Sequence, residues 1–244
     1  MKTLISFLIL TVITITALFS NIGPSTPNLD QFLTTKYQQL DKGEFDLPPF
    51  DLFELGLIGH FNLKESGKIL SKDIITLIDF RVSSNNRRLW IVDLNQNKVM
   101  FQTVVSHGKN TGEEFARNFS NTIHSNKSSL GLYITGEKYY GKHGLSLRLD
   151  GQEAGFNDNA RQRAVVIHGA SYATRDFAKA YGRLGRSFGC PAIPKKYHKE
   201  MINLISDKST LFIYYPSTDY LQNSKFLNRE RADQYLSKFI SKNT

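Results

Sequence analysis

The chain has 244 residues, 31 of them basic and 22 acidic, which gives a formal net charge of +9, and it contains one cysteine. Hydrophobic residues make up 40% of the chain and aromatic residues 12%, which excludes a disordered protein and allows one or two domains with a sizeable core. A single cysteine excludes an internal disulfide and a cysteine-based zinc cluster. Only the N-terminus has an apolar stretch long enough to consider as a membrane segment, which excludes a multi-pass membrane protein.

The N-terminal segment predicts export. Lys2 precedes a segment without charge over residues 3–29, in which 12 of the 16 residues of Leu4–Phe19 are apolar. This length suits the core of a secretory signal better than a spanning helix, which needs ~20 apolar residues. We therefore predict a signal peptide over residues 1–23, with an uncleaved N-terminal membrane anchor or a buried helix as alternatives. The folded part is expected to be secreted, in the periplasm or cell envelope.

Export changes the interpretation of the basic charge. No run of Lys or Arg exceeds two residues, and outside the cytoplasm the anionic partners are envelope polymers and lipid headgroups rather than nucleic acid. We therefore expect no nucleic-acid partner. A mildly basic, solvated surface is favoured over a dedicated binding patch.

Helices are predicted near both ends of the chain. Five apolar residues recur at helical spacing over residues 29–40, behind a helix start signal at Asn28. A second short helix is expected over Leu52–Phe61, and another continues through Met201–Ile205. An amphipathic helix that includes Ala232–Ile240 ends the chain.

Seven strands are predicted between these helices, because the segments are rich in β-branched, apolar and aromatic residues. The pattern predicts one mainly β domain over residues 71–220, with a helical N-terminal extension over 24–70 and a C-terminal helix over 221–244. The predicted strands are Ile74–Phe80, Leu89–Leu94, Val99–Val105, Leu130–Thr135, Leu145–Leu149, Ala164–Ile167 and Leu211–Tyr215.

The residues that could carry out catalysis lie between His168 and Cys190. A lone cysteine in an exported chain is either an inert buried residue or a working thiol. Gly189 permits a positive φ and Pro191 fixes the backbone, so this turn can expose the sulfur and direct backbone N–H groups at a substrate oxygen. His168 follows the strand over 164–167, where its imidazole can take the thiol proton and give a thiolate at neutral pH.

These residues resemble the active-site signature of the L,D-transpeptidases with a YkuD-like catalytic domain. The resemblance is carried by VIHG over residues 166–169 and by GRSFGCP over residues 185–191. The chain is more closely similar to the branch known as murein L,D-transpeptidase catalytic domain family proteins. Further matching segments extend the resemblance over residues 75–215, most of the mature chain, in the expected order: 89–94, 105–108, 119–121, 128–131 and 140–144.

The resemblance implies a β-sandwich-like catalytic fold with short helices at both ends, and a peptidoglycan-modifying transferase with a cysteine nucleophile. In that family the cysteine attacks the third residue of a donor stem peptide, the terminal D-alanine leaves, and an acceptor amine takes the acyl group from the thioester. The partners are therefore donor and acceptor stem peptides. No metal or organic cofactor is required, and we expect a monomer.

The family's functional residues fall on matching positions of this chain. Cys190 corresponds to the nucleophile and His168 to the general base. The Gly169 carbonyl corresponds to the group that orients the imidazole, and the N–H groups of Gly189 and Cys190 to the oxyanion site. Ser187 is expected either to hydrogen-bond the histidine or to cap the turn.

Two departures from the more familiar signature affect substrate recognition. Phe188 stands where that signature has a histidine, and Ala192 stands where a residue could bind a substrate carboxylate. A carboxylate clamp must then come from elsewhere, and a guanidinium pairs with a carboxylate in a bidentate fork. The candidates are Arg163, Arg175, Arg183 and Arg186, at least two of which are expected to be surface charges.

Other polar residues are given weaker roles. Tyr140 and His143 belong to a glycine-bounded loop over 139–144 that could cover the site, limit water access and contact substrate. His107 is expected in a turn rather than in the cleft. His60, His124 and His198 are expected at the surface or in packing, and the histidines are too scattered for a metal site.

Two alternatives to the transpeptidase remain open. An L,D-carboxypeptidase would use the same thioester with water as the acceptor, and the sequence hardly distinguishes it. A catalytically idle wall-binding module would keep the fold, but it needs neither the thiol nor the imidazole, so the presence of both argues against it.

Overall fold

The computed structural model describes residues 28–68 and 70–243, so the segment 1–23 lies outside the described residues. Within these ranges, no helix combines the length and the apolar character that crossing a membrane requires. The described helices are α1 (Leu29–Gln38), α2 (Phe50–Glu65), α3 (Arg175–Tyr181), α4 (His198–Ile205), α5 (Thr218–Asn223) and α6 (Arg229–Asn243).

The described strands form one eight-stranded sheet in the order β3-β2-β1-β8-β4-β5-β6-β7. The pairs β1–β8 and β6–β7 are parallel, and the other neighbours are antiparallel. The strands are β1 (Ile74–Asp79), β2 (Leu89–Asp93), β3 (Lys98–Thr103), β4 (Gly131–Gly141), β5 (Gly144–Gly151), β6 (Val166–Ala170), β7 (Ala192–Pro194) and β8 (Thr210–Tyr214).

The sheet curls so that its two ends come together. The chain that leaves β3, at one end of the strand order, reaches β7 at the other end. There the Ser106 N–H donates to the Ala192 carbonyl at 2.8 Å, as an antiparallel bridge. The sheet is therefore barrel-like rather than open, and the prediction of a mainly β, sandwich-like catalytic fold with short helices at both ends is confirmed.

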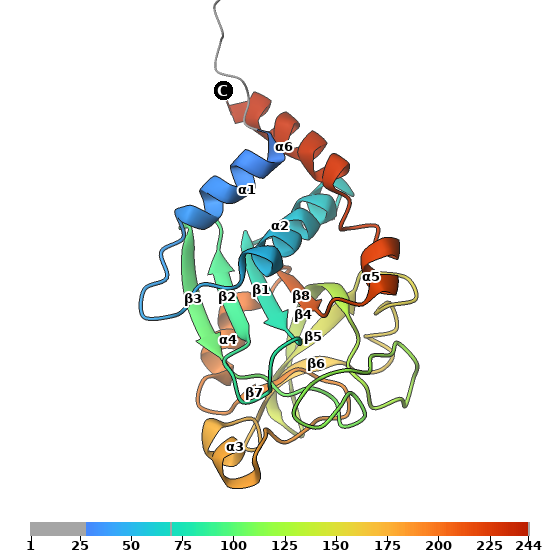
Figure 1. The fold of residues 1–244 in the computed structure, drawn as a ribbon. Helices are drawn as coiled ribbons and strands as arrows, with labels where there is room; N and C mark the ends of the chain where they lie inside the picture. The colour runs from blue at the N-terminus through green and yellow to red at the C-terminus, as the bar shows by residue number, and fades with distance from the viewer. Residues whose placement is uncertain (1–27, 69, 244) are drawn as a thin grey trace, which may run out of the picture.

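Helices from both ends of the chain gather on one side of this sheet. In Figure 1, α1, α2 and α6 lie together at one end of the molecule, and α3 and β7 lie at the other end. The long helix α2 contacts β1 and β8, and α6 contacts α2. Leu52, Ile58 and Leu63 of α2 are fully buried, because its apolar face covers the sheet.

Several elements differ from the sequence prediction. The segment 139–144 is not a loop, because β4 and β5 form one hairpin in which Tyr140 lies opposite Leu145 and only Lys142 and His143 make the turn. The outer half of β4 is largely exposed, so it lacks the apolar alternation that marks a strand. The short elements β7, α3 and α5 were also not predicted.

Candidate active site

The imidazole with the expected chemistry lies on β6, and the thiol lies in the turn that leads into the neighbouring parallel strand, β7. In the register of β6 and β7, His168 lies opposite Ala192, and Cys190 precedes Ala192 by two residues. The Val166 N–H is 3.5 Å from Cys190 Sγ. Strand residues two apart point to the same face, so the structure brings Cys190 beside the start of β6 and His168 one step further along.

Ser187 holds the turn that carries the thiol. Its Oγ donates to the Cys190 carbonyl at 2.6 Å and accepts from the Gly189 N–H at 3.0 Å. The hydroxyl thus caps the turn, and within the described chain it has no hydrogen bond to His168. The Gly189 N–H, which we expected at the oxyanion site, is already engaged by this bond. That leaves the Cys190 N–H to serve a substrate oxygen.

Gly189 is required by the shape of this turn. Its φ is 125°, a backbone conformation that side chains disfavour. A Cβ on this residue would also lie 2.8 Å from the Lys127 carbonyl oxygen. The turn therefore approaches the neighbouring backbone too closely for any residue except glycine.

Two other loops support the turn. The Ser187 N–H donates to the His107 carbonyl at 3.0 Å, and the Ser128 hydroxyl donates to the Gly189 carbonyl at 3.1 Å. His107 is buried rather than exposed in a cleft, and its Nδ1 lies 2.8 Å from Arg88 Nη2. Since a guanidinium only donates, His107 Nδ1 accepts this bond and the ring proton is on Nε2.

His168 is buried and held in one orientation. Its Nδ1 lies 3.3 Å from the carbonyl oxygen of Gly169, and the His143 ring stacks on it with centroids 4.2 Å apart and planes at 21°. Burial first, then the positive charges of His143 and Lys142, lowers the pKa of His168 to about 4. A Cβ on Gly169 would lie 2.8 Å from the His198 ring, so glycine allows α4 to pack against β6.

Cys190 is half-buried and its thiol is bonded to backbone groups. Besides accepting from Val166, the sulfur lies 3.6 Å from the Ala164 carbonyl, to which the thiol donates. Burial raises the pKa of Cys190, and the charges of Arg163 and Lys142 oppose this rise only in part. The expectation of a thiolate at neutral pH is therefore wrong for this state, in which the thiol and the imidazole are both neutral.

Three of the four arginines expected as candidates to clamp a carboxylate are already occupied, and the fourth, Arg175, begins α3 at an exposed position. Arg186 and Arg183 both pair with Glu113. Arg163 donates to the Ser120 carbonyl at 2.7 Å and holds the loop beside the cysteine turn. These guanidinium groups fix loops around the site, and none of the three presents a free fork to a ligand.

A groove lies beside His168, between the β4–β5 hairpin tip and the start of α4. It has a volume of about 540 Å³, and Tyr140 and His143 of the hairpin line it. Tyr172, a residue that the sequence analysis did not single out, also lines it. Burial, then the negative charge of a Cys190 thiolate, raises the pKa of Tyr172 to about 12. Its hydroxyl is therefore within electrostatic reach of the sulfur.

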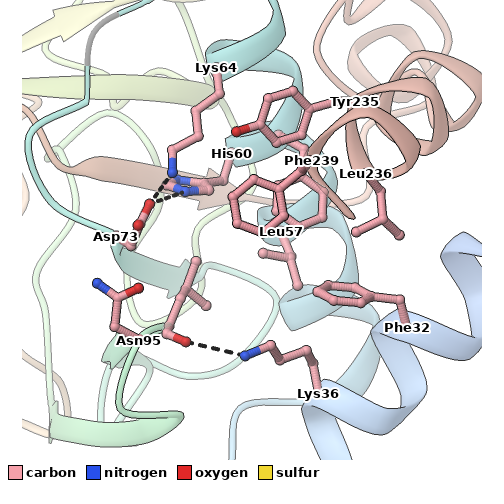
Figure 2. Close-up of a pocket in the computed structure, with 12 residues that line it drawn as sticks. Phe32, Lys36, Leu57, His60, Lys64, Asp73, Asn95, Tyr235, Leu236 and Phe239 are labelled. Atoms are coloured by element: carbon pink, nitrogen blue, oxygen red, sulfur yellow. Dashed lines mark hydrogen bonds and ion pairs between the residues drawn. The ribbon is translucent and has the colours of Figure 1, made fainter. Parts of the chain in front are cut away.

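A second pocket, of about 110 Å³, lies among α1, α2 and α6 (Figure 2). Its charged groups and its histidine already have partners: His60 and Lys64 both contact Asp73, and Lys36 donates to the Leu94 carbonyl at 3.3 Å. His60 therefore has the packing role that the sequence analysis allowed for it. In Figure 1 these helices lie at the end of the molecule opposite β7, so this pocket is separate from the cysteine turn.

The chain matches known proteins over most of its described length. A model of the family described as L,D-transpeptidase catalytic domain matches residues 48–214. Among curated proteins, none matches the chain.

Solved structures that resemble the chain do so at low sequence identity. An L,D-transpeptidase from Mycobacterium smegmatis is 10% identical, with 59% of this chain and 59% of that chain covered and a TM-score of 0.37. The helical cell shape determining protein Pgp2 from Campylobacter jejuni is 12% identical, with 77% and 64% covered and a TM-score of 0.43. An Enterococcus faecium L,D-transpeptidase is 15% identical, with 60% and 51% covered and a TM-score of 0.37. The chain thus spans less than two thirds of each of these proteins.

Proposed function

Because this chain belongs to the family of L,D-transpeptidase catalytic domains, we propose that it transfers acyl groups between peptidoglycan stem peptides through a thioester on Cys190. The observation that carries the proposal lies within the matched region: one imidazole is on β6, and one thiol, in the turn that leads into the adjacent parallel strand β7, contacts the first residue of β6. The Cys190 turn is held by Ser187, and the His168 ring is held by the Gly169 carbonyl.

Formation of the thioester needs one proton relay. With the Nδ1 proton of His168 directed to Gly169, Nε2 is the base that takes the Cys190 thiol proton. The sulfur bonds to the carbonyl carbon of the third stem residue, and the Cys190 N–H stabilises the oxyanion. The bond from that carbon to the D-alanine nitrogen then breaks, and the imidazolium gives its proton to the departing amine.

Transfer repeats these steps in reverse with a new amine. The acceptor amine attacks the thioester carbon, His168 takes a proton from it, and the carbon–sulfur bond breaks as that proton returns to the sulfur. The products are a new amide and the free thiol. Water in place of the amine would give the tripeptide of an L,D-carboxypeptidase instead.

The cellular setting is part of the same proposal. We place the folded domain outside the cytoplasm, in the periplasm or cell envelope, with residues 1–23 as a signal peptide or an N-terminal membrane anchor. The uncharged segment over residues 3–29 supports this placement. The protein is proposed to act as a monomer, with an N-terminal extension over 24–70, a catalytic domain over 71–220 and a C-terminal helix over 221–244.

The proposal is tested with purified tetrapeptide muropeptides and mass spectrometry of the products. The unaltered protein should give a dimer with the mass of two donors minus one alanine. Cys190→Ser should lower the rate by about 10⁶-fold, because a hydroxyl is far harder to deprotonate than a thiol, while the melting temperature stays unchanged. Tripeptide alone would establish the carboxypeptidase, and turnover by a folded Cys190→Ser protein would refute the proposed nucleophile.

A further inference from the structure

The groove beside His168 is basic and holds no acidic side chain. The groove is lined by three lysines: Lys142 at the hairpin tip, Lys195 just before α4 and Lys199 within α4. All three are exposed. Within the part of the chain that the structure describes, the lysines in ion pairs are others, at positions 64, 98 and 238. The groove therefore collects positive charge that no carboxylate of the described chain neutralises.

The strand register places this groove on the far side of His168 from the thiol. Cys190 lies beside Val166, the first residue of β6, whereas the groove is lined by Gly169 and Ala170 at the end of that strand. At ~3.3 Å per residue, Val166 and Ala170 are ~13 Å apart. Sulfur, imidazole and groove thus follow one another along β6, over a span that a short peptide can cover.

The charge of Lys142, in the groove, affects both reacting groups. Its positive charge lowers the pKa of the Cys190 thiol and that of the His168 imidazole, so it lies within electrostatic reach of both groups. Tyr172 likewise lines the groove and feels the charge of a Cys190 thiolate. Two residues of the groove, Lys142 and Tyr172, are therefore within electrostatic reach of the reacting centre.

In the proposed reaction, the leaving amino acid extends from the thiol past His168 towards the groove. His168 must be within hydrogen-bond reach of the departing amine in order to protonate it. In a terminal amino acid, the amine and the free carboxylate are attached to the same carbon. With the thiol on one side of the imidazole, the carboxylate must lie on the other side, at the mouth of the groove.

We propose that the groove is a subsite for the free carboxylate next to the reacting amine, with the ammonium groups of Lys142, Lys195 and Lys199 as its partners. This inference rests on the proposed function and adds the group by which the leaving residue is recognised. It also accounts for Ala192, which cannot bind a carboxylate, and for the engagement of Arg163, Arg183 and Arg186 in loop contacts.

The test compares two donors that differ only in this group. One is a tetrapeptide muropeptide that ends in a free carboxylate, and the other is its C-terminal carboxamide. The protein variant is Lys142→Gln/Lys195→Gln/Lys199→Gln, and its matched control is Lys42→Gln/Lys68→Gln/Lys225→Gln, which removes the same charge from exposed lysines outside the groove. All measurements use the full chain at fixed ionic strength.

The expected result is a selective loss of carboxylate recognition. For the free-acid donor, kcat/KM should fall about tenfold or more in the groove variant, mainly through KM, because charge-assisted hydrogen bonds are lost. For the carboxamide donor the fall should be much smaller, because only the effect of Lys142 on the pKa of the thiol and of the imidazole remains. The control variant should match the unaltered protein on both donors.

The possible failures are distinguishable from one another. If the groove variant keeps the unaltered protein's preference for the free acid, or loses rate equally on both donors, the subsite is wrong while the proposed function stands. If the unaltered protein processes neither donor, the proposed function fails and this inference fails with it. A melting temperature equal to that of the unaltered protein confirms that the variant is folded.

Discussion

Cys190 and His168 are both neutral at neutral pH in this structure. Burial acts in opposite directions on the two side chains, because it disfavours the charged form of each: it raises the pKa of the thiol and lowers that of the imidazole. In the proposed mechanism, proton transfer from sulfur to imidazole therefore takes place during the reaction and not in the resting protein. The resting thiol should be correspondingly slow towards simple alkylating agents.

Alkylation of Cys190 by iodoacetamide, followed against pH, tests this protonation state. The apparent pKa of the thiol should lie above its ordinary value of 9.0. Lys142→Gln should raise it further, because a positive charge near the thiolate is removed, whereas Lys225→Gln should leave it unchanged. His168→Ala should also leave the curve unchanged, since the imidazole is uncharged above its pKa of about 4. A midpoint near neutral pH that rises in His168→Ala would instead reveal a thiolate–imidazolium pair.

At the level of residues, the sequence indicated the glycines of the two turns better than it indicated which side chains bond to one another. Gly169 and Gly189 mark close backbone approaches that a local pattern can indicate. The role of Ser187 was left open, because a hydroxyl in a turn can bond to several groups. The stack of His143 on His168 depends on a hairpin that reaches across from β4 and β5, which no local pattern encodes.

At the level of elements, the strands of the core were predicted and the exposed or short elements were not. β1, β2 and β8 are buried along almost their whole length, so their apolar composition identifies them. β7 has three residues and α5 has six, too few to show a period. α3 follows a Thr174 cap that accepts from the Phe177 N–H at 3.1 Å, a signal that the sequence analysis did not use.

Residues 139–144 were predicted as a loop and instead belong to a β-hairpin, and this difference changes the shape of the site. A glycine-bounded loop would have been free to fold over the thioester. The observed hairpin instead continues two paired strands of the sheet and fixes Lys142 and His143 at its turn. Strand pairing thus places these two side chains beside His168 as part of the groove wall.

At the level of the whole molecule, buried hydrogen bonds link the position of the cysteine turn to the core. Arg88 is fully buried and donates to the Val105 carbonyl, at 3.1 Å from Nε and 2.9 Å from Nη2, and to His107. His107 in turn accepts the Ser187 N–H through its carbonyl. Buried donors and acceptors are costly to leave unpaired, so this chain of bonds makes the position of the turn depend on the core.

The same buried imidazoles make stability depend on pH. Burial lowers the pKa of His60, and it lowers those of His107 and His168 to about 4. An unfolded imidazole takes up a proton near pH 6.5, whereas the folded one remains neutral until about pH 4. The free energy of unfolding should therefore decrease as pH falls through this window, by about 3 kcal/mol for His107 alone. Glu153, whose pKa burial raises, opposes this trend, because its folded carboxyl takes up a proton before the unfolded one does.

Thermal unfolding between pH 8 and pH 4 measures this effect. The melting temperature should be constant down to about pH 6.5 and then fall steadily towards pH 4. His124→Gln, at an exposed position, should follow the same curve. A melting temperature that stays constant down to pH 4.5 would show that the buried imidazoles do not resist protonation.

We propose that the acyl group passes through a covalent bond to Cys190, and intact-protein mass spectrometry can detect that bond. The protein is mixed with a tetrapeptide donor, quenched in acid within seconds and weighed, and the modified residue is located by peptide mapping. We predict a mass gain equal to the donor minus one alanine, located on Cys190 and absent from Cys190→Ser. Turnover of the donor without any such adduct, or an adduct on another residue, would refute the thioester on Cys190.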